Sequence, residues 1–380
     1  EKIESRQQEV LVLTALAKTN LGTSTAGQMY ERLPELIELT RNGADARMRA
    51  KAGRAAVFLL GITRHKEAME ELLVVVDSIP KSDLDLDSVG HLVLARSILL
   101  YHLRRTSESW TQVNEGIDEL RRRGAADLVM VQLHLGLGSI TSAQGKYADA
   151  VVSHETALQM ALRLGNNSQA ASIAGNLGLC YSRLGRHQDQ LQLVSKIPLP
   201  TGPDFLGFVE MQYAYSTAIS HIALGRSDKA CEVLRGLDSR LLGEIPPWMI
   251  QAWRLWGADV LLLARKTGDA NASGHAATTG FSNRLLSNSF AGPFARWIAL
   301  TNKTSPDSQP ALALVQSLAD RLQDFDAIDQ AGVLVALRIL EKARHGGTAG
   351  LTEKIRAKMQ LLPRAVGNQL LILEDPSYVP

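Results

Sequence analysis

Apolar residues recur along the chain at the three- and four-residue spacing of amphipathic helices. In Ala55–Pro80, "AAVFLLGITRHKEAMEELLVVVDSIP", two apolar runs flank a short polar turn, and a proline closes the segment. This spacing predicts two helices, each with one buried face. Long alternations of β-branched and polar residues, which indicate strands, are scarce. The pattern therefore predicts an all-α protein.

The helical pattern repeats with a period of 40 residues between residues 127 and 237. A unit of this length fits one pair of antiparallel helices, which buries its apolar faces only by stacking on neighbouring pairs. Glycine suits the turn of each unit because helices commonly end in a residue with positive φ. A small residue inside the first helix lets the second helix approach closely. The coinciding turn residues are Gly145, Gly185 and Gly225, and the coinciding small residues are Gly138, Gly178 and Ala218.

The flanking units extend this series less regularly. We expect the small position at Ala56 and Ile98 before the clear copies and, more loosely, at Gly257 after them. With Ile98 in that position, the inner residue of the following helix is Trp110, so this pair is expected to pack differently from the others.

The spacing of the best copy resembles the tetratricopeptide repeat. The second copy has His187 and Gln190 where that pattern has an aromatic residue and Ala, and the 40-residue period exceeds the usual length of about 34 residues. Longer helices absorb the difference in a long-repeat variety found in bacterial signalling regulators. The resemblance implies a right-handed superhelical solenoid of antiparallel helix pairs, about eight or nine of them at this period. The residues that carry it are Gly138, Gly145, Tyr147, Ala150 and Ala157 in the first copy, Leu177, Gly178, Tyr181 and Gly185 in the second, and Leu224, Gly225 and Ala230 in the third.

One solenoid is expected to occupy residues 1–380. The chain begins at Glu1 rather than Met, which suggests a piece of a longer polypeptide. Periodicity leaves 268–280 open between helix and loop. Later helices are expected at 294–302, 310–323, 327–343 and 351–361. The predicted parts are an N-terminal capping pair at 1–50, regular repeats at 51–268, degenerate repeats and a C-terminal cap at 269–373, and a tail at 374–380.

The balance of charges and the cysteine content indicate which cellular compartment and which kinds of partner to expect. The 41 basic and 39 acidic residues nearly cancel, so no whole-molecule field favours direct nucleic-acid or membrane binding. Cys180 and Cys231 lie in different repeats and are expected to be free thiols of a reducing compartment. No apolar run approaches 18 residues and no signal peptide is evident, so a cytoplasmic location is expected.

The sequence offers no convincing catalytic, cofactor or metal site. The glycines around residue 138 lack the spacing of a phosphate loop, and the nine histidines are scattered, which favours packing or surface roles. Asp83, Asp85 and Asp87 lack the glycine and glutamate of a calcium-binding loop, so helix capping and solvation are expected instead. We therefore predict a protein that is not an enzyme, with an active site assembled across repeats as the minor alternative.

In a stack of this kind the first helix of each pair lines a concave groove. Asn176 is the leading candidate for partner binding because its amide can bond both the N–H and the C=O of an extended peptide. The alternative is a hydrophilic residue on an exposed helix face. The Lys and Asn clamp of chaperone-docking relatives is absent. Position in the repeat gives the groove candidates Arg54, Arg96, Gln132, Leu135, Ser139, Ser142, Asn176, Arg183, Gln212, Tyr215, Ser216 and Arg254.

The resulting functional hypothesis is a protein- or peptide-binding module. The segment Ala157–Gln190 is similar to repeats of bacterial maltose-activator-type transcription regulators, which implies a sensory or regulatory part of a larger signalling protein, with possible self-association. Two alternatives stay open. One is a constitutive scaffold subunit of a multiprotein complex, and the other is a small-molecule inducer sensor near Trp248, Trp253 and Trp256.

Overall fold

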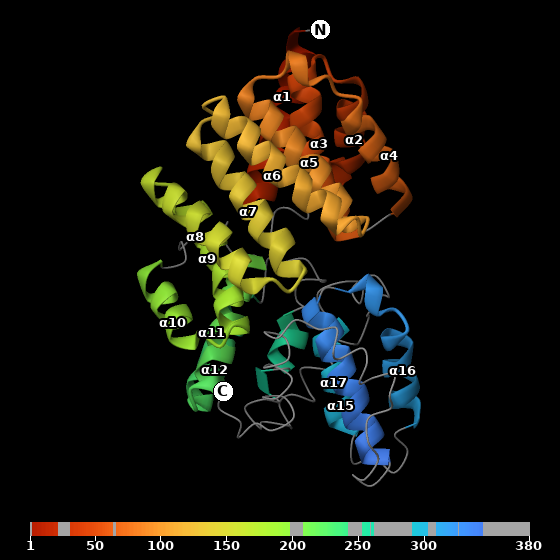
Figure 1. Ribbon diagram of the computed structural model, residues 1–380, viewed down its shortest axis with the longest axis vertical. Coiled ribbons are helices and arrows are strands. Elements are labelled where there is room, and N and C mark those ends of the chain that lie inside the picture. The colour runs from red at the N-terminus through yellow and green to blue at the C-terminus, as the bar shows by residue number, and fades with distance from the viewer. Residues whose placement is uncertain are drawn as a thin grey trace. The chain divides into compact units, whose positions relative to one another are not determined.

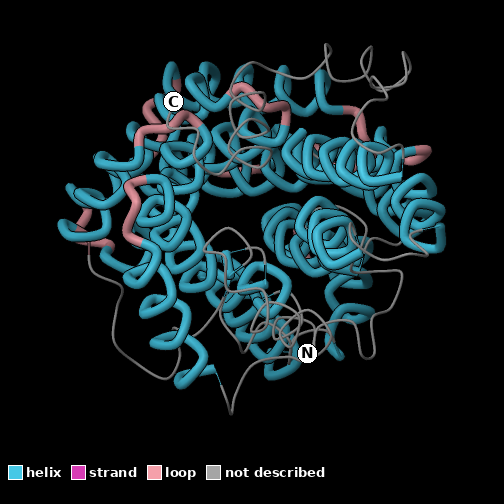
Figure 2. Tube along the Cα trace, turned by 90° about the horizontal axis from the view of Figure 1, so that it is seen from below, coloured by secondary structure: helices cyan, strands magenta, loops and turns pink. Residues whose placement is uncertain are grey.

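The computed structural model is helical in the parts of the chain that it describes (Figures 1 and 2). Within those parts, short 3-10 turns such as Lys81–Asp83 and Leu322–Asp324 add to the α-helices. The structure describes residues 2–21, 31–63, 66–197, 208–241, 253–258, 260–261, 291–302, 309–325 and 327–344. The α-helices are α1 Lys2–Leu21, α2 Leu33–Asn42, α3 Ala46–Thr63, α4 Lys66–Asp77, α5 Leu86–His102, α6 Thr106–Arg122, α7 Asp127–Ala143, α8 Tyr147–Arg163, α9 Asn167–Arg183, α10 His187–Lys196, α11 Phe208–Ala223, α12 Ser227–Leu241, α15 Ala291–Asn302, α16 Gln309–Ala319 and α17 Ala327–Arg344.

The chain forms two compact units. The first unit contains residues 1–142, 148–177 and 197–210. The second contains residues 143–147, 178–196 and 211–380.

Helices α3 and α5 form the centre of the first unit. Helices α1, α2, α4 and α5 pack against α3, and α5 also packs against α4 and α6 (Figure 1). Leu59, Leu99, Leu120 and Leu133 are completely buried in this core. Burying a leucine side chain contributes about 1.5–3 kcal/mol, so stacking of neighbouring pairs is the main source of stability here.

The predicted glycine turns adopt the expected left-handed conformation. Gly145, Gly185 and Gly225 have φ of 77°, 72° and 73°, and each follows the first helix of a pair. Glycine adopts this conformation without a steric penalty. At Gly185 two backbone bonds close the helix, Gly185 N to Ser182 O at 3.3 Å and Arg186 N to Tyr181 O at 2.9 Å. This is the Schellman arrangement, which satisfies carbonyls at the end of a helix.

The turn between α5 and α6 corrects the predicted register of that pair. Arg104 has φ of 65°, the same conformation as Gly145, and it lies 41 residues before Gly145 rather than the 40 of the predicted register. Ser97 therefore takes the small position that the sequence pattern assigned to Ile98. The hydroxyl of Ser109 donates to Ser97 O at 2.7 Å, and both serines are completely buried. Trp110, predicted to face inward, is 42% exposed.

Asp85 and Asp87 have the capping and solvation roles expected of them. The Asp85 carboxylate accepts a bond of 2.8 Å from Ser88 N and caps the N-terminus of α5. Asp87 forms an ion pair of 3.4 Å with Lys51, and its Oδ2 lies 3.5 Å from Nε2 of His91. Its hydrogen bond with His91 is the main reason that the pKa of the Asp87 carboxyl falls to about 2.

In the second unit, a buried polar network replaces the apolar packing of the repeat pattern. Gln190 Nε2 donates to Ser216 Oγ at 3.0 Å and to Thr217 Oγ1 at 3.2 Å. His187 Nδ1 lies 3.3 Å from Ser220 Oγ. The two residues at which the second copy departs from the tetratricopeptide pattern therefore join α10 to α11 by hydrogen bonds.

The predicted later helices are confirmed at α15, α16 and α17. Helices α15 and α17 approach closely at Gly292 and Gly332, where a Cβ on Gly332 would lie 2.6 Å from Gly292 Cα. Asp329 Oδ1 accepts a bond of 2.7 Å from Gly292 N and so caps α15 from α17. The predictions for 268–280, 351–361 and the tail at 374–380 lie outside the described residues.

Candidate functional site

Helix α7 presents one accessible face in the first unit. Gln132, Leu135, Ser139 and Ser142 share this face at spacings of three and four residues. Ser139 is exposed and the other three are partly buried. Ser139 Oγ donates to Leu135 O at 3.0 Å, so its hydroxyl oxygen can still accept a bond.

Close packing of α7 on α8 fixes which face of α7 remains accessible. A Cβ on Gly138 would lie 2.5 Å from Cε1 and 2.6 Å from Nδ1 of His154. The His154 ring is completely buried, and burial lowers its pKa to about 4. The imidazole is therefore neutral at physiological pH and acts as a packing group, as expected for the scattered histidines.

Helix α5 contributes partly exposed residues at the equivalent positions. Helix α7 packs on α5 where Gly90 meets Val129 and where Gly136 meets Leu94. The 41-residue offset relates Gln132, Ser139 and Ser142 of α7 to His91, Ile98 and Tyr101 of α5, all three partly buried. Sequence reasoning missed these residues because it placed the register of α5 one residue too far along. The positive φ at Arg104, which no glycine marks, is the signal that corrects it.

Asn176 lies on α9 in the part of that helix that belongs to the first unit. Its side chain is partly buried, and Nδ2 donates to Ser172 O, one turn earlier, at 3.1 Å. The bond uses one amide hydrogen. A second hydrogen and the carbonyl oxygen of the amide are the groups that a peptide backbone can pair with.

Arg96 is engaged by neighbouring helices of its own unit. Its Nε donates to Asp77 Oδ1 at 2.7 Å, and Nη1 donates to Gln112. These partners lie on α4, the second helix of the preceding pair, and on α6, the second helix of its own pair. Arg96 entered the groove prediction through the register that assigned Ile98 to the small position, and the corrected register gives Ala95 instead.

Arg54 of α3 is the most deeply buried of the predicted cations. It is 7% exposed, and burial lowers the pKa of its guanidinium to about 10. The group nevertheless remains charged at neutral pH, about three pH units below that value. Arg54 was predicted from its place two residues before Ala56. The corrected register of α5 leaves Ala56 in the small position of α3.

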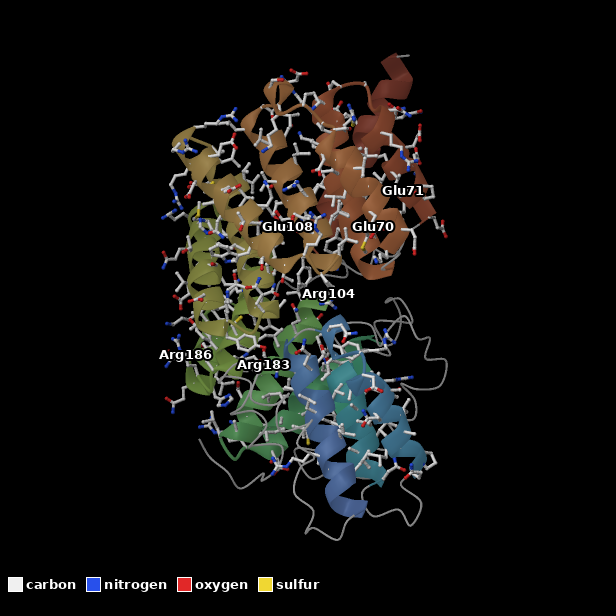
Figure 3. All side chains as sticks on the ribbon, turned by 45° about the vertical axis from the view of Figure 1, so that its right-hand side comes forward. Glu70, Glu71, Arg104, Glu108, Arg183 and Arg186 are labelled. Atoms are coloured by element: carbon white, nitrogen blue, oxygen red, sulfur yellow. The ribbon has the colours of Figure 1, made fainter. Side chains whose placement is uncertain are left out.

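The groove candidates of the second unit are mostly covered. Gln212, Tyr215 and Ser216 are buried, and the Tyr215 ring stacks on Trp256 with centroids 4.9 Å apart. Arg183, labelled in Figure 3, lies 5.9 Å from the centroid of the Tyr215 ring. Arg254 is partly buried. Position in the repeat could not reveal this coverage, because it does not specify which side chain of one repeat stacks on a side chain of the next, as Trp256 does on Tyr215.

Comparisons with known proteins support this architecture. Residues 129–192 match a family model described as a tetratricopeptide repeat. The apo form of the quorum sensor NprR from B. thuringiensis is similar in structure, with a TM-score of 0.57 at 12% identity over 97% of this chain and 99% of that one. The chain has a tetratricopeptide-repeat-like α-solenoid fold. NprR in complex with its cognate peptide NprX gives a TM-score of 0.56 at 13% identity, covering 96% of this chain and 99% of that one. The comparison with curated proteins gave no match.

In the described part of this tetratricopeptide-repeat-like solenoid, no group of three or more side chains suited to a metal ion comes together. Cys180 and Cys231 are both free thiols, the first buried and the second partly buried. None of the helices in the described ranges has the length and apolar character needed to cross a bilayer.

Proposed function

We propose that the chain is a non-enzymatic regulatory module that binds a peptide or an extended protein segment on the accessible face of α7. The observation that carries the proposal is that face itself, where Ser139 is exposed and Gln132, Leu135 and Ser142 remain partly accessible. The fold shared with peptide-bound NprR supports it, because that solenoid accommodates a peptide. Asn176 extends the surface onto α9.

The chemistry of this surface suits an extended chain. Hydroxyl and amide groups of Ser139, Gln132 and Asn176 can pair with peptide N–H and C=O groups, and Leu135 with Ile98 offers apolar contact. The stripe from Gln132 to Ser142 rises about 15 Å at 1.5 Å per residue. This length matches about four or five residues of extended peptide.

A regulatory role follows if the bound peptide stabilises one arrangement of the helix pairs over another. A ligand shifts such an equilibrium only by its difference in affinity for the two arrangements. On this proposal the chain transmits peptide binding to the larger cytoplasmic signalling protein of which it forms part. The small-molecule alternative finds less support, since Trp253 and Trp256 are buried and Tyr215 already stacks on Trp256.

The test begins by selecting peptides from a random library against the full chain and measuring their affinity by isothermal titration calorimetry. We expect Ser139→Arg to weaken binding at least tenfold because the larger side chain fills the accessible face. Asn176→Ala should weaken it about five- to tenfold, the loss of one or two hydrogen bonds. Gln159→Arg, at an exposed position of α8, is the matched control and should leave affinity unchanged. Equal affinity of wild type and Ser139→Arg would refute the proposal.

A further inference from the structure

Arg54 is a buried cation to which the described part of the chain supplies no counterion. Its Nη1 is inaccessible to solvent and makes no hydrogen bond, and the described residues supply no ion pair to the side chain. Charged groups in protein interiors are almost always paired, because removing an ion from water costs several kcal/mol. A buried guanidinium with unused donors is therefore a site that an anion can complete.

The residues that share the helix face with Arg54 show the pairing that it lacks. Arg47, Lys51 and Arg54 follow one another on α3 at spacings of four and three residues. Arg47 pairs with Asp85 at 3.5 Å, and Lys51 pairs with Asp87 at 3.4 Å. The three cations thus become less exposed from Arg47 to Arg54. The carboxylates at the start of α5 pair with the first two and not with Arg54.

The chemistry of the guanidinium group determines which ligand groups Arg54 can bind. Arginine presents planar N–H donors that match the oxygens of a carboxylate or phosphate in a two-point contact. In a buried setting such a charged hydrogen bond is stronger than at the surface, because water competes less for it. Arg47 and Lys51 add positive charge on the approach to Arg54, although their own partners offset part of it.

We propose that Arg54 binds an oxyanion group of a ligand through its guanidinium. The group is either a carboxylate carried by the bound peptide or a small free anion such as phosphate. The peptide source rests on the proposed peptide-binding function, whereas the free-anion source does not.

The experiment measures thermal unfolding of the full chain with increasing inorganic phosphate, at constant ionic strength maintained with chloride. We expect phosphate to raise the Tm of the wild type through mass action on the folded state. Arg54→Met keeps similar volume without charge, and it should remove the phosphate-dependent rise in Tm. Arg47→Met is the matched control, since it removes a cation of the same face that is exposed and already paired; it should leave the phosphate-dependent rise within twofold.

A second arm separates the sources with a selected peptide that has either a free or an amidated C-terminus, or neutralised acidic side chains. If the peptide supplies the oxyanion, neutralising one of its carboxylates should weaken wild-type binding at least tenfold and leave Arg54→Met binding unchanged. Arg54→Lys keeps the charge but loses the two-point contact, so it should weaken both responses and serves if Arg54→Met does not fold.

The outcomes distinguish this inference from the proposed function. If peptides bind wild type and Arg54→Met equally, and phosphate shifts the Tm of both alike, the oxyanion site is refuted while peptide binding stands. If no peptide binds but phosphate stabilises only chains with Arg54, the oxyanion site is supported and the peptide function fails. Loss of stability in Arg54→Met with no difference in anion response means a structural role only and overturns the inference.

Discussion

Replacement of Gly138 by alanine tests whether the period in the sequence reflects close approach of α7 and α8. The added Cβ would lie 2.5, 2.6 and 2.8 Å from three atoms of the His154 ring, all closer than Cβ atoms pack. The ring is completely buried and cannot swing into solvent. The helices must therefore move apart or the ring must leave its rotamer.

The magnitude follows from two opposing effects. Overpacking a close-packed interface costs about 1–3 kcal/mol. Replacing glycine by alanine inside a helix returns about 1 kcal/mol through helix propensity. Taking the upper half of the packing range, because three ring atoms clash at once, we expect Gly138→Ala to destabilise the chain by about 1–2 kcal/mol.

Gly236→Ala provides the matched control. Gly236 lies inside α12, and a Cβ there would meet no atom within 4 Å. Only the propensity effect remains, so this substitution should stabilise by about 0.5–1 kcal/mol. Gly178→Ala should fall between the two, since its nearest contacts are Ser216 Oγ at 3.2 Å and Gln190 Nε2 at 3.3 Å.

The assay is urea denaturation of the full-length variants followed by far-ultraviolet circular dichroism. A double-mutant cycle with His154→Ala isolates the clash, because the penalty of Gly138→Ala should disappear once the ring is gone. If Gly138→Ala were as stabilising as Gly236→Ala, the explanation of the small positions as sites of close helix approach would be refuted.

Three further predictions concern buried and capping groups. Burial lowers the pKa of His154 from an ordinary 6.5 to about 4, so between these pH values the unfolded chain binds more protons than the folded chain. The free energy of unfolding should therefore fall by up to about 3 kcal/mol as pH drops through that window. Denaturation midpoints measured from pH 7 to 4 should fall less for His154→Leu than for wild type, and parallel curves would contradict this. Asp329→Ala leaves the buried Gly292 N–H without its acceptor and should lower stability by about 1–3 kcal/mol, measured by urea denaturation against the exposed control Asp320→Ala. Asp85→Ala removes the N-cap of α5 and should lower stability by about 1 kcal/mol, whereas Asp83→Ala should have little effect; equal effects would contradict the assigned cap.

The sequence was sufficient to predict the helix pairs wherever glycine marks the turns. Gly145, Gly185 and Gly225 set the period, and the structure places all three in the left-handed conformation. The register of the α5–α6 pair was predicted wrongly because Arg104 adopts that conformation without being glycine. The small position was therefore assigned to Ile98 instead of Ser97. A one-residue error rotates a helix position by about 100°, which was enough to move Arg96 from the flank of the interface into the predicted groove.

The candidate site was less accessible to sequence reasoning than the fold. Position in the repeat placed Gln132, Leu135, Ser139 and Ser142 on one face of α7, because Gly138 and Gly145 set the register of that helix. It could not distinguish Ser139, which is exposed, from Tyr215 and Ser216, which are buried. Burial of Tyr215 depends on stacking with Trp256, a contact between residues 41 positions apart that no local pattern encodes.

Photocrosslinking shows whether a bound peptide lies against the accessible face of α7. A benzophenone amino acid placed at Ser139 of α7, or at the exposed control position Gln159 of α8, is irradiated in the presence of a selected, labelled peptide. The account predicts that label transfers to the chain from Ser139 and not from Gln159, and that excess unlabelled peptide abolishes the transfer. Equal transfer at both positions, or transfer only at Gln159, would show that the accessible face of α7 is not where the peptide binds.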